Sequence, residues 1–214
     1  MANGFDDHNR LGLKKRFFFP FFASQLSCFS EISVDKRHSS SPAESIPRFH
    51  FSDWVPFPVE RVFLFFANPE NLPRIMPPST GTRIDALRLV PPTTQPTSIT
   101  QPVAGLGSEI VTSFRILPFL GIRATWIAQI TEFEWNHHFA DVQVEGPFRI
   151  WRHRHALRRE TRHEVEGTVV TDEIECQVGW GVIGRLVLRF VLAKQIENTF
   201  AFRQNVLPRL LAEK

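Results

Sequence analysis

Residues 54–72 read WVPFPVERVFLFFANPENL, and they predict the end of a strand followed by two short helical segments. Apolar and polar residues alternate from Arg48 to Phe57, which is the two-residue period of a strand. Residues 58–68 then have helical spacing, with Pro58 near the first turn, where a missing amide hydrogen costs little. Residues 69–75 form a second, shorter helical turn.

The rest of the chain is predicted to form strands and then one long helix. Residues 91–102, rich in Pro, Thr and Gln, are typical of a surface loop. Residues 182–211 have helical periodicity, and Pro208 is expected to bend or end that helix. Gly, Pro or polar turn residues bound most of the predicted strands, which are 82–90, 108–117, 122–134, 138–145, 148–158 and 165–177.

This order of elements predicts an α+β domain with a curved antiparallel sheet. A sheet with one apolar face needs a cover, and only the last helix is long enough to supply it. A helix across a concave sheet leaves room for a small-molecule site between the two.

The chain of 214 residues is long enough for one well-buried domain, predicted at 48–214. Residues 1–47 are expected to be a disordered extension, because their apolar run at 17–22 is short and interrupted by Pro20. That run is too short for a transmembrane segment, and it lacks the cleavage site of a signal peptide. Cys28 and Cys176 suggest no disulfide framework, so we expect a cytoplasmic protein.

Four further motifs follow in order, and with residues 54–72 they cover roughly residues 48–211. On these motifs the chain resembles the START-like SRPBCC superfamily, in particular the bacterial ligand-binding and cyclase/dehydrase-type proteins. The motifs are Asp141-x-Gln143-x-x-Gly146-Pro147-Phe148, Trp151-x-His153-x-His155, Thr168-x-x-x-Asp172 and Phe200-x-x-Arg203.

The resemblance implies a helix-grip fold. In it a seven-stranded curved antiparallel sheet wraps round a long C-terminal helix, two short helices follow the first strand, and a hydrophobic cavity lies between sheet and helix. Similar proteins include polyketide cyclases, coenzyme-Q-binding START domains and lipid-transfer domains, so the fold does not fix the function. Phe148 stands where a tyrosine is common, which weakens any mechanism that needs a tyrosine acid.

The strand at 148–158 contains most of the candidate functional side chains. Trp151, His153 and His155 share one face of it with Arg149. If this strand pairs with 165–177, Asp172 lies near Trp151 and His153. Three alternatives are open: a metal site, a general base made of a histidine and an aspartate, or a hydrogen-bonded framework. We favour the framework or a polar pocket wall, and we expect no metal.

On the last helix, Arg203 lies one turn beyond Phe200 and shares its face. Arg203 either anchors an anionic group of a ligand or forms an ion pair with a sheet acid such as Asp141, and we favour the ion pair. The predicted ligand-binding residues are Trp126, Trp151, His153, Phe190, Ile196, Phe200 and Arg203.

Two other motifs do not indicate the binding functions that they usually signal. Residues 179–184 match the G-x-G-x-x-G pattern, but a single helix follows them, so no second parallel strand can complete a dinucleotide site. The arginines of residues 149–162 fall on both faces of the strand, and the net charge is only +3. We therefore expect no cofactor and no nucleic-acid partner.

The sequence thus predicts a carrier or sensor of a hydrophobic or amphipathic small molecule, such as a lipid, a quinone or a polyketide-like compound. One alternative is a cyclase/dehydrase-type enzyme using His153, His155 and Asp172. Another is an accessory domain that acts through protein contacts. The sequence does not predict an oligomeric state.

Overall fold

A computed structural model describes residues 46–93, 99–117, 122–179 and 181–213. The first strand, β1 (Arg48–Val55), leads into the helix α1 (Val59–Ala67) and the short 3-10 helices η1 (Pro69–Arg74) and η2 (Pro78–Thr80). Asn68 ends α1, and its side chain caps η1 by accepting a hydrogen bond from the amide of Glu70. The two short helices predicted from residues 54–72 are therefore present.

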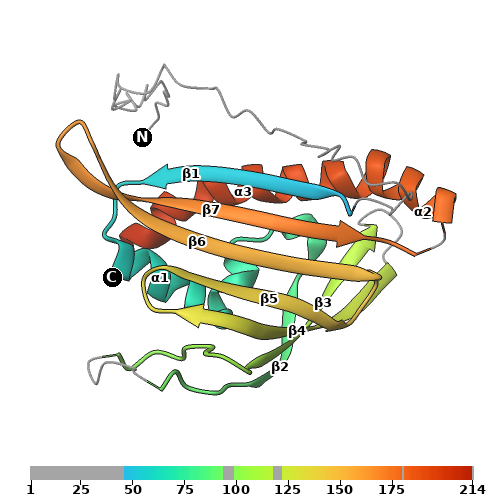
Figure 1. The fold of residues 1–214 in the computed structure, drawn as a ribbon, viewed down its shortest axis with the longest axis horizontal. Coiled ribbons are helices and arrows are strands. Elements are labelled where there is room, and N and C mark those ends of the chain that lie inside the picture. Colours follow the sequence, from blue (N-terminus) through green and yellow to red (C-terminus); the bar gives the residue numbers. More distant parts are fainter. Residues whose placement is uncertain (1–45, 94–98, 118–121, 180, 214) are drawn as a thin grey trace, which may run out of the picture.

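Six more strands complete one sheet. They are β2 (Arg83–Arg88), β3 (Glu109–Leu117), β4 (Ile122–Glu134), β5 (His138–Glu145), β6 (Ile150–Arg162) and β7 (Val165–Gln177). The seven strands are antiparallel in the order β1-β7-β6-β5-β4-β3-β2, so the first strand pairs with the last (Figure 1). This order confirms the predicted seven-stranded sheet.

The C-terminal helical segment covers one face of the sheet (Figure 1). It consists of α2 (Gly181–Val187), a π-helical segment at Leu188–Leu192 and α3 (Ala193–Ala212). Pro208 was expected to bend or end this helix, but α3 continues past it to Ala212. The arrangement confirms the helix-grip fold.

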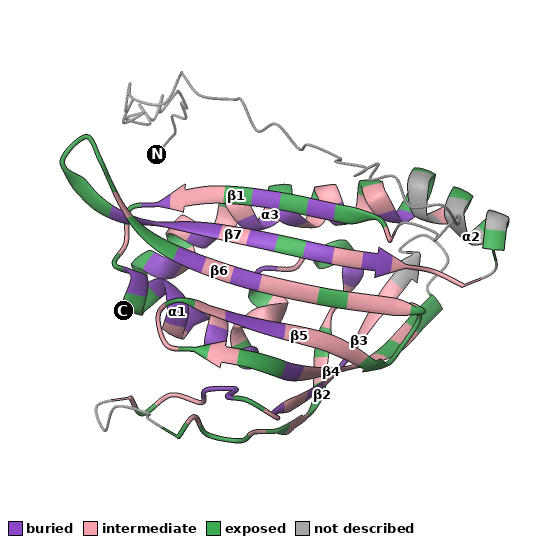
Figure 2. Cartoon of the chain, in the orientation of Figure 1, coloured by how far each residue is buried: buried purple, intermediate pink, exposed green. Residues whose placement is uncertain are grey.

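The core lies between the sheet and the helices, and burial alternates along the first part of β1 and along β7 from Thr171 to Cys176 (Figure 2). In β1, Phe49 and Phe51 are buried while His50 and Ser52 are exposed. The ring of Phe51 stacks on Phe200 of α3 with centroids 4.0 Å apart. Because side chains alternate along a strand, the inward face of each strand is fixed by one such contact.

Two further predictions concern the N-terminal extension and a membrane-spanning segment. Residues 1–45, and with them Cys28 and most of the predicted extension, lie outside the described residues. Among the described residues no helix is both long enough and apolar enough to cross a membrane.

Candidate functional site

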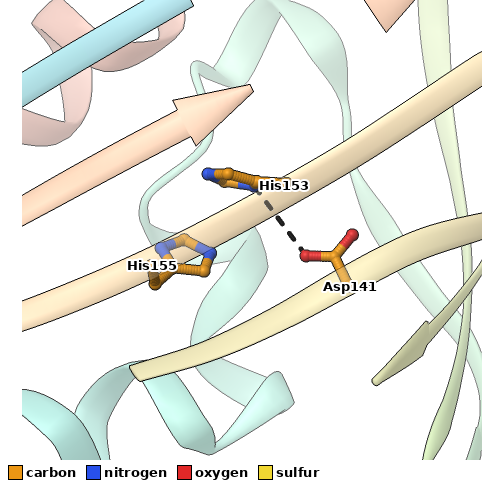
Figure 3. A group of neighbouring side chains, drawn as sticks. All are labelled: Asp141, His153 and His155. Carbon is orange, nitrogen blue, oxygen red and sulfur yellow. Dashed lines mark ion pairs between the residues drawn. The ribbon is translucent and has the colours of Figure 1, made fainter. Parts of the chain in front are cut away.

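The inward face of β5, β6 and β7 carries a cluster of ionisable side chains beneath α3. Asp141 comes from β5, His153 and His155 from β6, and Asp172 from β7. Arg203 reaches the cluster from α3. Figure 3 shows Asp141 and the two imidazoles close together. We call these five residues the polar cluster.

Asp172 is the centre of the polar cluster, and none of its surface is exposed. Arg203 Nη1 donates to Asp172 Oδ1 at 2.9 Å, and Nη2 donates to Oδ2, so the pair is bidentate. His153 Nε2 lies 3.0 Å from Asp172 Oδ1. His155 Nδ1 lies 2.7 Å from the same oxygen, but off the direction of a hydrogen bond.

Asp141 lies on the other side of His153. Its Oδ2 is 3.8 Å from His153 Nδ1 (Figure 3). The indole N–H of Trp151 is close enough to favour the charged carboxylate of Asp141, although it does not reach hydrogen-bond geometry. Asp141 thus has weaker partners than Asp172.

The two carboxylates therefore titrate differently. Burial raises the pKa of Asp172, but Arg203, His155 and His153 outweigh it and hold the pKa well below its ordinary value. Burial raises the pKa of Asp141 to about 6, with only partial opposition from His153. Burial and the neighbouring His155 lower the pKa of His153, so its imidazole is neutral at neutral pH.

An aromatic group lies beside the polar cluster on the same face. Trp126 of β4 packs edge-on against Trp151 of β6 with ring centroids 4.7 Å apart. Phe148 lies 4.9 Å from Trp151 and 5.7 Å from Trp126. The indole nitrogens of both tryptophans are buried without a hydrogen-bond partner.

The face of α3 that meets the sheet is apolar around Arg203. The guanidinium carbon lies 4.4 Å from the centre of the Phe200 ring and 5.3 Å from that of Phe66, which adds a cation–π attraction. Ile196 is buried in the same group as Phe200 and Phe51. The helix therefore positions one cation in an otherwise apolar wall.

The structure corrects three predictions about these residues. Arg203 pairs with Asp172 rather than Asp141, because the α3 side chain reaches β7. Asp172 lies opposite His155 in the β6–β7 ladder, not beside Trp151, although it still reaches His153. The side chain of Phe190 is 67% exposed, so it does not line an enclosed cavity.

The other predicted ligand-binding residues do come together. Trp126 and Trp151 lie beside His153 on the sheet, and Ile196, Phe200 and Arg203 lie on the facing side of α3. Sequence reasoning gave Asp141 no place beside the histidines and overlooked Phe139 and Phe66, whose rings lie 4.4 Å and 5.6 Å from His155. The signal for β5 was available, since Phe139 and Asp141 alternate onto one face.

Two surface hollows lie elsewhere on the molecule. One of about 490 Å³ lies between α1, the 99–101 loop and the end of α3, and one of about 460 Å³ lies beside the β4–β5 turn. None of the predicted ligand-binding residues lines either hollow.

Comparison with known proteins identifies the fold and nothing more specific. No family model and no curated protein matches the chain. Among solved structures, a protein from Thermus thermophilus has a TM-score of 0.55 at 16% identity, covering 77% of this chain and 97% of that one. A START superfamily protein from Mycobacterium smegmatis has a TM-score of 0.53 at 14% identity, covering 77% and 96%.

A third similar structure is the Zhui aromatase/cyclase of a Streptomyces species, with a TM-score of 0.51 at 14% identity, covering 77% of this chain and 92% of that one. The chain therefore has the START-like fold of the SRPBCC type, as the sequence motifs implied. At these identities the likeness concerns the fold alone.

Proposed function

We propose that the protein binds an amphipathic small molecule between the sheet and the C-terminal helix. One observation supports this above all: the indole nitrogens of Trp126 and Trp151, whose rings are in contact, are both buried without a hydrogen bond, and Trp151 has only the Asp141 carboxylate nearby. Buried donors are nearly always paired in folded proteins, and an unpaired one costs about 1–3 kcal/mol. A ligand oxygen within reach of one of these nitrogens would supply the missing acceptor.

The surrounding groups indicate the chemistry of that ligand. Trp126, Phe148 and Trp151 offer flat apolar surfaces at edge-to-face and tilted angles, which suit a planar ring. The charged side chains of the nearby polar cluster would pair with a polar group at one end of the ligand. Among a lipid, a quinone and a polyketide-like compound, a ring that bears a carbonyl oxygen therefore fits better than an aliphatic chain.

A matched pair of probes tests this proposal. α-Tetralone and tetralin share a bicyclic skeleton, and only the first has a carbonyl oxygen. By calorimetry we expect α-tetralone to bind about tenfold more tightly, because it gains one net hydrogen bond of about 1.4 kcal/mol. In Trp126→Phe or in Trp151→Phe that ratio should fall towards one, since each variant keeps a ring but loses one donor.

Trp54→Phe is the matched control, because the Trp54 indole already donates to the Glu160 carbonyl at 3.0 Å. It should leave the ratio between the two probes unchanged. Equal affinity for both probes in the wild type, or an unchanged ratio in both site variants, would contradict the proposal.

A cyclase/dehydrase-type activity is the second candidate, and the inward direction of His153 favours it. His153 is paired with Asp172 at 3.0 Å, and its pKa is lowered, so a neutral imidazole is available as a general base. The base would remove a proton from carbon next to a carbonyl group.

Hydrogen–deuterium exchange of α-tetralone in D₂O tests that step without knowledge of the natural substrate. We expect the wild type to accelerate exchange next to the carbonyl group over buffer, and His153→Gln to abolish the acceleration. His50→Gln is the control, because His50 is exposed on β1. An exchange rate equal to that of buffer would exclude base catalysis on this probe and leave the binding proposal intact.

A further inference from the structure

Three side chains of the polar cluster offer the ligand set of a transition-metal site. Asp141, His153 and His155 each offer one ligand atom, and these atoms all lie within 4.8 Å of one another (Figure 3). Imidazole nitrogen and carboxylate oxygen are ligands of Zn²⁺ and of its first-row neighbours. Within the described part of the chain, no other group of three such residues is found.

The distances require little rearrangement. A tetrahedral zinc ion with bonds of about 2.1 Å holds its ligand atoms about 3.4 Å apart. His153 Nδ1 and Asp141 Oδ2 are already 3.8 Å apart. His153 and His155 are two residues apart on β6, so their rings lie on one face with centroids 4.0 Å apart. Small side-chain rotations would therefore close the site.

Asp172 holds His153 from the side opposite Asp141, and it also lies close to His155. It lies against Nε2 of His153 at 3.0 Å and Nδ1 of His155 at 2.7 Å. In His153 this leaves Nδ1, the nitrogen that faces Asp141, as the ligand atom. Metal-bound histidines are commonly held by a carboxylate on the other ring nitrogen, and Arg203 fixes this carboxylate in turn.

We infer that Asp141, His153 and His155 bind one divalent transition-metal ion, with Asp172 and Arg203 positioning His153. Three protein ligands leave a coordination position open. The inference goes beyond small-molecule binding and does not depend on it, because it uses different side chains from the two tryptophans.

Native mass spectrometry and calorimetry test this site with Zn²⁺ alone. The full-length protein is treated with a chelator, dialysed and titrated with zinc chloride. We expect one ion per chain, and we expect Asp141→Asn and His155→Gln each to weaken binding at least tenfold. Co²⁺ in place of Zn²⁺ should give visible absorption bands that saturate at one equivalent and are lost in the same variants.

His138→Gln is the matched control, because His138 alternates with Phe139 onto the opposite face of β5, where it lies 3.4 Å from Glu132 and from Glu134. It should bind zinc as the wild type does. Binding that is lost in His138→Gln, binding unaffected by Asp141→Asn, or no ion per chain would each overturn the inference.

The isosteric Asp141→Asn leaves both partners of the Asp172–Arg203 pair in place, so its circular dichroism spectrum should match that of the wild type, which separates a loss of zinc from a loss of fold. The α-tetralone titration is repeated in the presence of chelator. A protein that binds no zinc could therefore still bind α-tetralone, and a protein that binds no α-tetralone could still bind zinc.

Discussion

Asp172→Asn should lower the free energy of unfolding by about 3–5 kcal/mol, because breaking a buried ion pair leaves the other charge without a partner. Asp172 is fully buried and Arg203 is only 5% exposed, so water cannot replace the lost carboxylate. The two imidazoles that contact Asp172 lose their partner as well. Urea unfolding followed by circular dichroism measures the difference.

Glu175→Gln on the same strand is the control. Glu175 pairs with Arg48 and Arg152, whose side chains are largely exposed, and such pairs contribute about 1 kcal/mol or less. A double-mutant cycle of Asp172→Asn and Arg203→Met should be strongly non-additive. Additive effects, or a loss no larger than that of Glu175→Gln, would show that the buried pair is not coupled.

The contribution of Asp172 has a defined dependence on pH. Its pKa in the folded protein lies well below the ordinary value of 3.8. A depressed carboxyl pKa gives stability that is fully present above the unfolded pKa, at about pH 4. That stability is lost only as the pH falls further, through the folded pKa.

Asp141→Asn should have the opposite effect and stabilise the metal-free protein by up to about 3 kcal/mol at pH 7, since one pKa unit corresponds to about 1.4 kcal/mol. Burial raises the pKa of Asp141 from 3.8 to about 6, so the folded state disfavours the charged carboxylate. An asparagine of the same shape removes this cost. His153, Trp151 and Asp172 are the groups that face Asp141 and shift its pKa.

The sign of the pH dependence follows from the raised pKa. Above pH 6 the carboxylate is charged in both states, and the wild type carries the full cost. As the pH falls from about 6 to about 4, the folded state takes up its proton first and the cost disappears. The advantage of the asparagine variant should therefore vanish near pH 4.

Urea unfolding of chelator-treated protein at pH 4, 5, 6 and 7 checks this trend. Glu173→Gln, an exposed carboxylate on β7, should show no such trend. A variant that is less stable than the wild type at pH 7 would show that Asp141 is well satisfied without a metal.

Most of the architecture could be read from local patterns. Strand periodicity gave the sheet, with bounds mostly within a few residues of those observed, because the two-residue alternation is visible in the sequence itself. The same alternation placed Trp151, His153 and His155 on one face. Alternation could not tell whether that face points to the core or to solvent. In the structure it points towards α3.

The register of β6 and β7 was harder to predict. Strand β6 extends to Arg162, and a two-residue turn at His163 and Glu164 joins it to β7. Both turn residues have positive φ, 48° and 64°, a conformation usually signalled by asparagine or glycine. Without that signal the predicted strand ended at 158, and Asp172 was expected opposite the wrong residues.

The sequence by itself determined the elements, their order and the residues that share each face, because these depend on neighbours a few positions apart. Tertiary structure alone decided that Arg203 of α3 meets Asp172 and that Asp141 joins the two histidines. Those contacts depend on strand register and on where the helix crosses the sheet. Both are set by the packing of the whole core, which no local spacing records.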